Sequence, residues 1–174
     1  SDTYSFHDVV KEAGVKGFTE PDPKIDLSGI DVARKILILI RESGYQMEIE
    51  DIENKSFLPA ECINTTDNDS FFASLIKNAS HFDNLLKEAN EKNSRLKFVA
   101  TFENGKASVG LEFIPQESPF YNLEGKDNIV QFYTDRYVDQ PLLIKGAGAG
   151  AGVTASGIFA DVARYLFDYY KIPK

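Results

Sequence analysis

The chain has 174 residues, 43% of them hydrophobic and 26% charged, which is enough for one globular domain with its own core. Its 27 acidic and 19 basic side chains give a net charge of −8, which disfavours binding to nucleic acid or to an anionic membrane. Cys62 is the only cysteine, so an intrachain disulfide and a multi-cysteine metal site are excluded. The absence of a long apolar run or a signal peptide adds to the expectation of a cytoplasmic protein.

Two helices are predicted in the first quarter of the chain. The first covers residues 5–14, with Ser5 as its N-cap and Gly14 ending it. The second covers residues 28–43, and its middle, residues 36–40, is apolar on every side. A helix that is apolar all round must be buried, so we expect this helix at the centre of the fold.

The remainder mixes helices with hairpin strands. Asn104-Gly105 between two alternating runs is the strongest hairpin signal in the chain. The predicted elements are one or two short strands in 46–58, a helical region 69–93 broken near 78–80, strands 96–102, 107–114, 129–133 and 142–145, and a closing helix 154–170. Because there is no strict βαβ rhythm, this order predicts an α+β fold with a mixed, mostly antiparallel sheet covered by helices on one face.

Asp31 and Lys35 are spaced i, i+4 and therefore lie on one face of the second helix. One interpretation is an ordinary intrahelical ion pair, with Ser28 and Asp31 forming an entry similar to a capping box. The other is that Asp31 holds Lys35 toward a substrate and that Lys35 moves a proton. The predicted burial of the helix favours the second interpretation, because a buried charge usually marks a site.

Three carboxylates, Glu20, Asp22 and Asp26, precede this helix in a segment stiffened by Pro21 and Pro23. Pro-Asp-Pro and Asp-Leu-Ser-Gly are common turn sequences at a protein surface. A rigid group of carboxylates is also suited to binding a cation such as the ammonium of an amino acid. The spacing matches no known Ca²⁺ or Mg²⁺ loop, so no metal is predicted.

Glycine alternates with alanine in residues 146–152, between a predicted strand and the closing helix. Such a run lets the backbone approach a ligand closely and directs helix N–H groups at anions. It is equally compatible with a closely packed turn, and it is not a dinucleotide-binding fingerprint by itself.

Two motifs resemble those of homoserine dehydrogenases. Gly17-Phe-Thr-Glu-Pro-Asp-Pro and Leu27-Ser-Gly-Ile-Asp-Val-Ala-Arg-Lys35 resemble the signature of that family's catalytic and dimerisation region. Gly146-Ala-Gly-Ala-Gly150, followed by Val153-Thr-Ala and Phe159-Ala-Asp, resembles its glycine-rich C-terminal motif. Phe18 departs from the Tyr that many members carry, which removes one hydroxyl.

The resemblance implies a role for each matching residue. Lys35 would exchange a proton with the substrate hydroxyl or carbonyl, and Asp31 would contact that end of the substrate and orient Lys35. The amino-acid end would be bound by Gly17, Glu20 and Asp26. The nicotinamide cofactor, NADP or NAD, would lie against Gly148 and Gly150.

The resemblance also implies an organisation. Residues 1–145 would form the substrate-binding and dimerisation domain, and residues 146–174 would contact a nucleotide-binding Rossmann domain that this sequence does not contain. The chain would then be a fragment, inactive alone, of an enzyme that interconverts L-homoserine and L-aspartate 4-semialdehyde in threonine and methionine biosynthesis. The parent would be a bifunctional aspartokinase–homoserine dehydrogenase that forms homodimers through the catalytic-domain sheet.

Two other functions are compatible with the residues. The chain is also suited to be a non-catalytic amino-acid-binding or dimerisation module, or part of a related oxidoreductase for another small carbonyl substrate. Lys35 distinguishes the first alternative, because a binding module has no need of a lysine opposite carboxylates that bind an ammonium.

Overall fold

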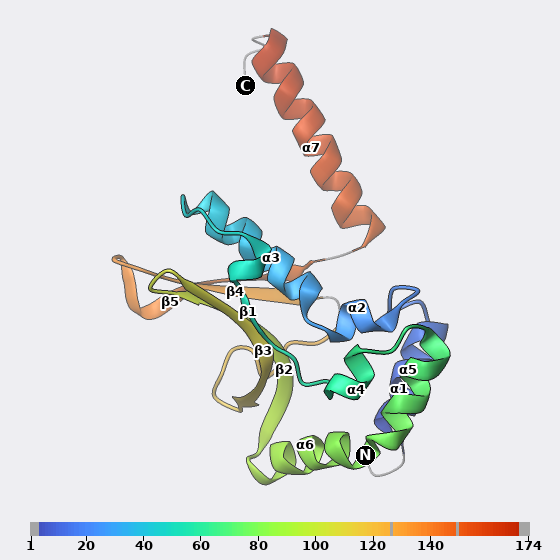
Figure 1. The fold of residues 1–174 in the computed structure, drawn as a ribbon. Helices are drawn as coiled ribbons and strands as arrows, with labels where there is room; N and C mark the ends of the chain where they lie inside the picture. The colour runs from blue at the N-terminus through green and yellow to red at the C-terminus, as the bar shows by residue number, and fades with distance from the viewer. Residues whose placement is uncertain (1–3, 126, 149, 171–174) are drawn as a thin grey trace. The chain divides into compact units, whose positions relative to one another are not determined.

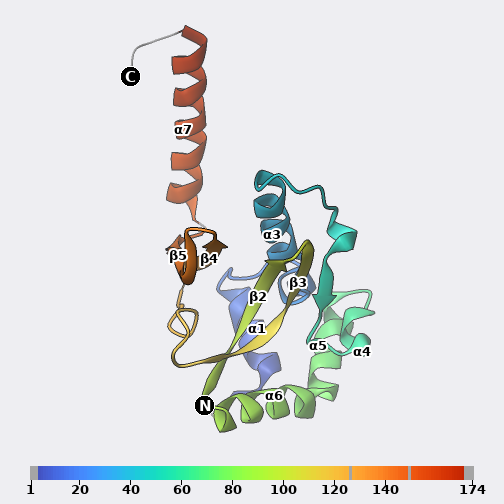
Figure 2. The same ribbon diagram turned by 90° about the vertical axis from the view of Figure 1, so that its left-hand side faces the viewer.

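The computed structural model describes residues 4–125, 127–148 and 150–170. The chain forms two compact units, Ser1–Ser118 and Pro119–Lys174 (Figures 1 and 2). The functional division predicted after residue 145 concerns contacts with another domain and stays a prediction.

The first unit combines short helices with a three-stranded sheet. Its helices are α1 (Phe6–Val15), α2 (Pro23–Leu27), α3 (Ile30–Glu42), α4 (Ala60–Ile63), α5 (Asn68–Lys77) and α6 (Ala79–Glu91), with a 3-10 turn at Ile49–Asp51. Its strands are β1 (Glu53–Lys55), β2 (Ser94–Glu103) and β3 (Lys106–Pro115). The break that separates α5 from α6 lies at Asn78, as the sequence predicts.

The sheet has the order β1-β3-β2 and is mixed, as predicted. β2 and β3 are antiparallel in one unbroken register from Ser94↔Pro115 to Glu103↔Lys106, whereas β1 is parallel to β3. Asn104 and Gly105 join β2 to β3 with φ values of 51° and 76°, which is the conformation of a type I′ turn. The hairpin prediction is therefore confirmed.

α3 packs on one face of this sheet. The cluster between them contains Ala33, Leu37, Ile40, Ile52, Ala107 and Val109, with Phe98, Ala100 and Phe102 against it. Leu37 and Ile40 are only 8% and 1% exposed, but Ile38 is 61% exposed. The expectation that α3 is buried on all sides is wrong, because the sheet covers only one side of the helix.

A second apolar cluster joins α1, α4, α5 and α6. It is built on Val10, Leu58, Cys62, Phe71, Leu75 and Phe82. The Phe6 ring stacks on Phe82 with centroids 4.4 Å apart, and Phe57 meets Phe98 at 5.8 Å. Phe57 therefore connects this cluster to the sheet.

α1 begins as predicted but ends later. Ser5 is its N-cap and forms a capping box with Asp8. The helix continues through Gly14, and Gly17 with φ of 72° ends it. The Phe18 N–H donates to the Ala13 carbonyl at 2.9 Å and the Gly17 N–H to the Gly14 carbonyl at 3.0 Å, a Schellman arrangement. The prediction that Gly14 ends this helix is therefore wrong, because Gly17 and not Gly14 takes the left-handed conformation that the motif requires.

The second unit contains a hairpin and a long helix. β4 (Asp127–Thr134) pairs with β5 (Tyr137–Ala147) in a two-stranded sheet, and α7 spans Ala151–Tyr170. The strands predicted at 129–133 and 142–145 are both present, and they pair with each other in antiparallel register. Among its described residues α7 has none that is buried. No helix in the described parts of the chain is long and apolar enough to cross a membrane.

Candidate functional site

The carboxylate-rich segment is more ordered than its turn sequences suggest. Asp22 is the N-cap of α2 and accepts a hydrogen bond from the Lys24 N–H at 3.0 Å, and Pro23 begins the helix. Ser28 ends α2, and Gly29 is the N-cap of α3 without a side-chain hydrogen bond. The predicted capping-box entry from Ser28 to α3 is therefore wrong, because the chain makes two helices here where one was expected.

Gly29 fixes the start of α3 against the sheet. It is buried, its φ is 80°, and a Cβ at this position would lie 2.7 Å from the Phe98 Cε1 and 3.2 Å from the Val109 Cγ1. Asn54, on β1, donates from its side-chain amide to the Ser28 carbonyl at 2.7 Å. Sequence reasoning missed both positioning residues. The glycine in Asp-Leu-Ser-Gly is an available signal, but an ordinary turn accounts for it equally well.

Asp31 and Lys35 form an ion pair on α3 with Nζ and Oδ2 2.8 Å apart. Their side chains are 54% and 51% exposed, so the burial that favoured a functional role is absent. An exposed i, i+4 pair of this kind contributes at most about 1 kcal/mol to stability. The pair is consequently accessible to a ligand, and its geometry is also that of an ordinary surface ion pair.

Glu20 and Asp26 are brought together by the backbone. The Glu20 N–H donates to the Asp26 Oδ2 at 2.8 Å, so the half-buried Asp26 holds the main chain at Glu20 in place. The Glu20 side chain is exposed. Gly17 ends α1 three residues earlier, so the helix end already accounts for a glycine there.

The two glycines predicted to contact a cofactor lie in the second unit, and their surroundings differ. A Cβ on Gly148 would collide with the side-chain amide of Asn128 and lie 3.1 Å from the Asn128 Cβ. Gly150 has a φ of 129°, and nothing lies within 4 Å of the position its Cβ would take. Packing inside the unit therefore explains a glycine at 148, whereas the side of Gly150 that a Cβ would occupy is open.

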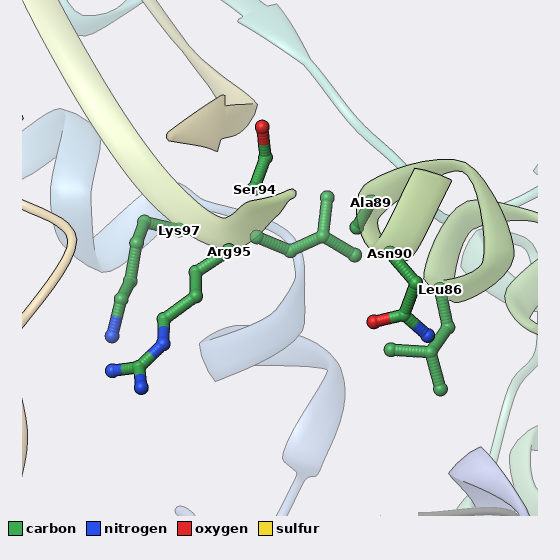
Figure 3. A pocket seen from close by; sticks show the side chains of 7 residues that line it. Leu86, Ala89, Asn90, Ser94, Arg95 and Lys97 are labelled. Atoms are coloured by element: carbon green, nitrogen blue, oxygen red, sulfur yellow. The ribbon is translucent and has the colours of Figure 1, made fainter. Parts of the chain in front are cut away.

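Depressions on the described surface include one of about 530 Å³ at residues 136–140 and one of about 320 Å³ between α6 and β2, which Figure 3 shows. The latter is lined by Leu86, Ala89, Asn90, Ser94, Arg95, Leu96 and Lys97. None of the predicted catalytic or substrate-binding residues lines it. In residues 4–125, 127–148 and 150–170, no group of three or more His, Cys, Asp or Glu side chains is arranged to hold a metal ion.

Comparison with known proteins identifies the family to which this chain is related. The family model for homoserine dehydrogenase matches residues 1–163. The chain is 42% identical over 173 residues to bifunctional aspartokinase/homoserine dehydrogenase 2 of Zea mays, covering 98% of this chain and 19% of that protein. It is 40% identical over 167 residues to homoserine dehydrogenase of Schizosaccharomyces pombe, covering 94% and 44%. The chain thus spans less than half the length of these relatives.

Solved structures share the fold of this chain. A Candida auris protein of unknown function is 36% identical and superposes with a TM-score of 0.84 over 94% of this chain and 46% of that one. Homoserine dehydrogenase of S. aureus, at 21% identity, shares the fold with a TM-score of 0.69 over 100% of this chain and 40% of that chain. The matched motifs, the α+β fold and the match of the family model to nearly the whole sequence lead to one conclusion: this chain belongs to the homoserine dehydrogenase family.

Proposed function

We propose that this chain supplies the substrate-binding and proton-transfer residues of an NAD(P)-dependent homoserine dehydrogenase, which interconverts L-homoserine and L-aspartate 4-semialdehyde. The observation that carries the proposal is the Asp31–Lys35 pair, which lies one turn apart and accessible on α3. The pair occurs within a family match that covers residues 1–163.

Lys35 is the proton-transfer group in this proposal. During oxidation its Nζ, as the neutral amine, accepts the proton that leaves the hydroxyl of homoserine and becomes the ammonium, and during reduction the ammonium returns this proton to the carbonyl oxygen of the semialdehyde. Asp31, whose carboxylate is 2.8 Å from this Nζ, limits the orientations available to the lysine. A positioned general acid–base of this kind typically contributes about 10²–10⁴-fold to the rate.

The amino-acid end of the substrate is assigned to Glu20, with Asp26 and Gly17 beside it. The exposed Glu20 carboxylate is suited to an ammonium group through a charge-assisted hydrogen bond. Asp26 already accepts the Glu20 N–H, so it contributes by holding this segment as well as by its charge.

A nicotinamide cofactor fits the glycine-rich segment at Gly150. The open side of Gly150 and the start of α7 at Ala151 leave room for a close backbone approach. The cofactor, NAD or NADP, exchanges the hydride of this reaction, which no side chain can supply. Gly148 is assigned only an indirect role, because Asn128 packs against it.

The other properties of the whole protein follow as proposals. We assign the chain to a homodimer and to the reducing environment of the cytoplasm, although the Zea mays relative is named as chloroplastic. The competing function is a non-catalytic amino-acid-binding or dimerisation module. It is favoured by the exposure of the Asp31–Lys35 pair, which is typical of ion pairs with no chemical role.

Substitution of Lys35 separates the two functions. In the natural protein that carries this chain, Lys35→Ala is expected to lower kcat for homoserine oxidation by about 10²–10⁴-fold, because the proton loses its acceptor. Steady-state kinetics with NAD and NADP measure the effect. Lys87→Ala is the matched control, since Lys87 forms an exposed i, i+4 ion pair with Glu91 on α6. A Lys35→Ala protein with the kcat of the wild type would refute the assignment.

A further inference from the structure

Two long-range hydrogen bonds hold the segment that carries Glu20. The side-chain amide of Asn68 donates to the Pro21 carbonyl at 2.8 Å, across 47 residues of sequence. The Nζ of Lys24 donates to the Thr65 carbonyl at 2.7 Å, across 41 residues. Both bonds connect the start of α2 and the residues before it to residues 65–68, which we call the α5 entry.

These bonds are placed to set the position of Glu20. Residues 18–22 join the end of α1 to the N-cap of α2, and Glu20 lies next to the carbonyl that Asn68 binds. The Lys24 side chain is only 18% exposed, so its ammonium is held at the Thr65 carbonyl instead of moving in solvent. Asp26 holds the same segment through the Glu20 N–H.

The α5 entry is itself well anchored. Asp67 caps α5 by accepting the Ser70 N–H at 2.8 Å, and the Thr65 hydroxyl donates to the Cys62 carbonyl at 2.8 Å. α5 then packs into the second apolar cluster through Phe71 and Leu75, which are almost fully buried. A fixed support beneath a segment that carries an exposed carboxylate is expected when a loop residue must be preorganised for binding.

From these contacts we propose that Asn68 and Lys24 are positioning residues for Glu20 and thereby for the amino-acid end of the substrate. The inference rests on the function proposed above and assigns two further residues to the same site: Lys24, between the two parts of the family signature, and Asn68, outside it. Neither side chain is required to touch the substrate. Their role is to keep the Glu20 carboxylate in its binding position before the substrate arrives.

Asn68→Asp is the sharpest test. Aspartate keeps the size of the side chain and is favourable in the first turn of a helix, so α5 retains its stability while the donor to Pro21 is lost. The added negative charge would by itself favour an ammonium ligand, so it cannot explain weaker binding. We expect KM for homoserine to rise about three- to tenfold with kcat changed less than twofold.

Three further variants complete the experiment. Lys24→Met removes the bond to Thr65 together with the 3.8 Å ion pair to Asp22, and it should raise KM similarly. Glu20→Gln gives the effect of losing the binding carboxylate itself. Asn64→Asp adds the same charge as Asn68→Asp nearby, on an exposed residue with no described side-chain contact to residues 18–22, and should behave as wild type. Hydrogen exchange of the peptide covering residues 18–24 is measured in each variant without substrate, and Asn68→Asp and Lys24→Met should exchange faster there.

The outcomes separate the two proposals. A wild-type protein that does not oxidise homoserine contradicts the proposed function and leaves the exchange measurement to test the hydrogen bonds alone. In an active wild type, faster exchange together with raised KM in Asn68→Asp and Lys24→Met supports the positioning role. Unchanged KM in both variants overturns it, even if exchange is faster, and so does a raised KM without faster exchange.

Discussion

The position of the candidate site depends on a single residue, Gly29, which has no side chain. The residue has a left-handed φ of 80°, and the Phe98 ring occupies the space where a Cβ would lie. α3 begins at the next residue, so the position of Asp31 and Lys35 relative to the sheet depends on this contact. A larger residue at 29 would have to move the helix or the ring.

Gly29→Ala is therefore expected to destabilise the protein by about 2–5 kcal/mol, from the left-handed backbone and the overpacking together. Urea unfolding monitored by circular dichroism measures the difference. Gly44→Ala is the control, because Gly44 has a similar φ of 89° but nothing within 4 Å of its Cβ position. Gly44→Ala should lower the free energy of unfolding only by the cost of the left-handed backbone, about 1–2 kcal/mol. Equal losses in the two variants would mean that Phe98 does not restrict position 29.

The candidate residues could be found from the sequence because their spacing and motifs are local. Lys35 and Asp31 share a helix face whichever residue begins the helix, and their ion pair is present. The exposure of the two side chains could not be predicted from the sequence, because it depends on which side of α3 the sheet covers. Asn54 and Asn68 act on backbone carbonyls far away in sequence, and no local pattern distinguishes such an asparagine from any other polar surface residue.

At the scale of the elements, two carboxylates cap the helices that build the second apolar cluster. The Ser5 hydroxyl and N–H, with His7, hydrogen-bond to Asp8 at the start of α1 and hold the pKa of that carboxyl below its usual value. Hydrogen bonds from Ser70, with help from Thr66, lower the pKa of Asp67 at the start of α5. Each carboxyl group stabilises its helix more strongly in the ionised form than in the protonated form.

These shifts predict how stability depends on acid. A carboxyl whose folded-state pKa is depressed stabilises the protein above its unfolded pKa of about 3.9 and loses that contribution as the pH falls through the folded value. The free energy of unfolding should therefore decrease as the pH falls below about 4. Urea titrations across this range measure it. Asp67→Asn retains a capping acceptor that does not titrate, so it should make the decrease shallower, and an unchanged slope would exclude Asp67 as a source.

The elements themselves were predictable where the signal is short-range. The Asn104-Gly105 turn, the Ser5 cap and the break at Asn78 are all set by neighbouring residues, and all three predictions hold. The helix boundaries between residues 22 and 30 were not predictable in the same way. There Asp22 and Pro23 start one helix and the packing of Gly29 starts another, so tertiary contact decides where α2 ends.

For the whole molecule, the second unit has much apolar surface and little core. Large side chains such as Ile144 on β5 and Phe159 on α7 are 55% and 73% exposed. A two-stranded sheet is marginally stable by itself, and a long helix without buried residues gains nothing from packing. We therefore expect this surface to be covered in the functional protein, which is consistent with the proposed homodimer.

Light scattering should give the isolated chain twice the 19.4 kDa mass of one copy. Ile144→Lys puts a charge on the exposed face of β5 and is expected to shift the protein toward the monomer, because the lysine would have to be buried unpaired in the interface. Lys106→Ala, at the turn of the first hairpin, serves as the control. A monomeric mass for the wild type would contradict the homodimer.

The parallel pairing of β1 with β3 has a consequence for the order of folding. β2 and β3 are joined by a two-residue turn, and a hairpin of this type forms within microseconds, about 1–10 μs. β1 can join only after the long segment between Glu53 and Ser108, which includes three helices, has been closed into a loop. Asn54 lies on that late strand and holds the carbonyl beside Gly29. The candidate site is therefore expected to reach its final geometry last, after the hairpin and α3 have already formed.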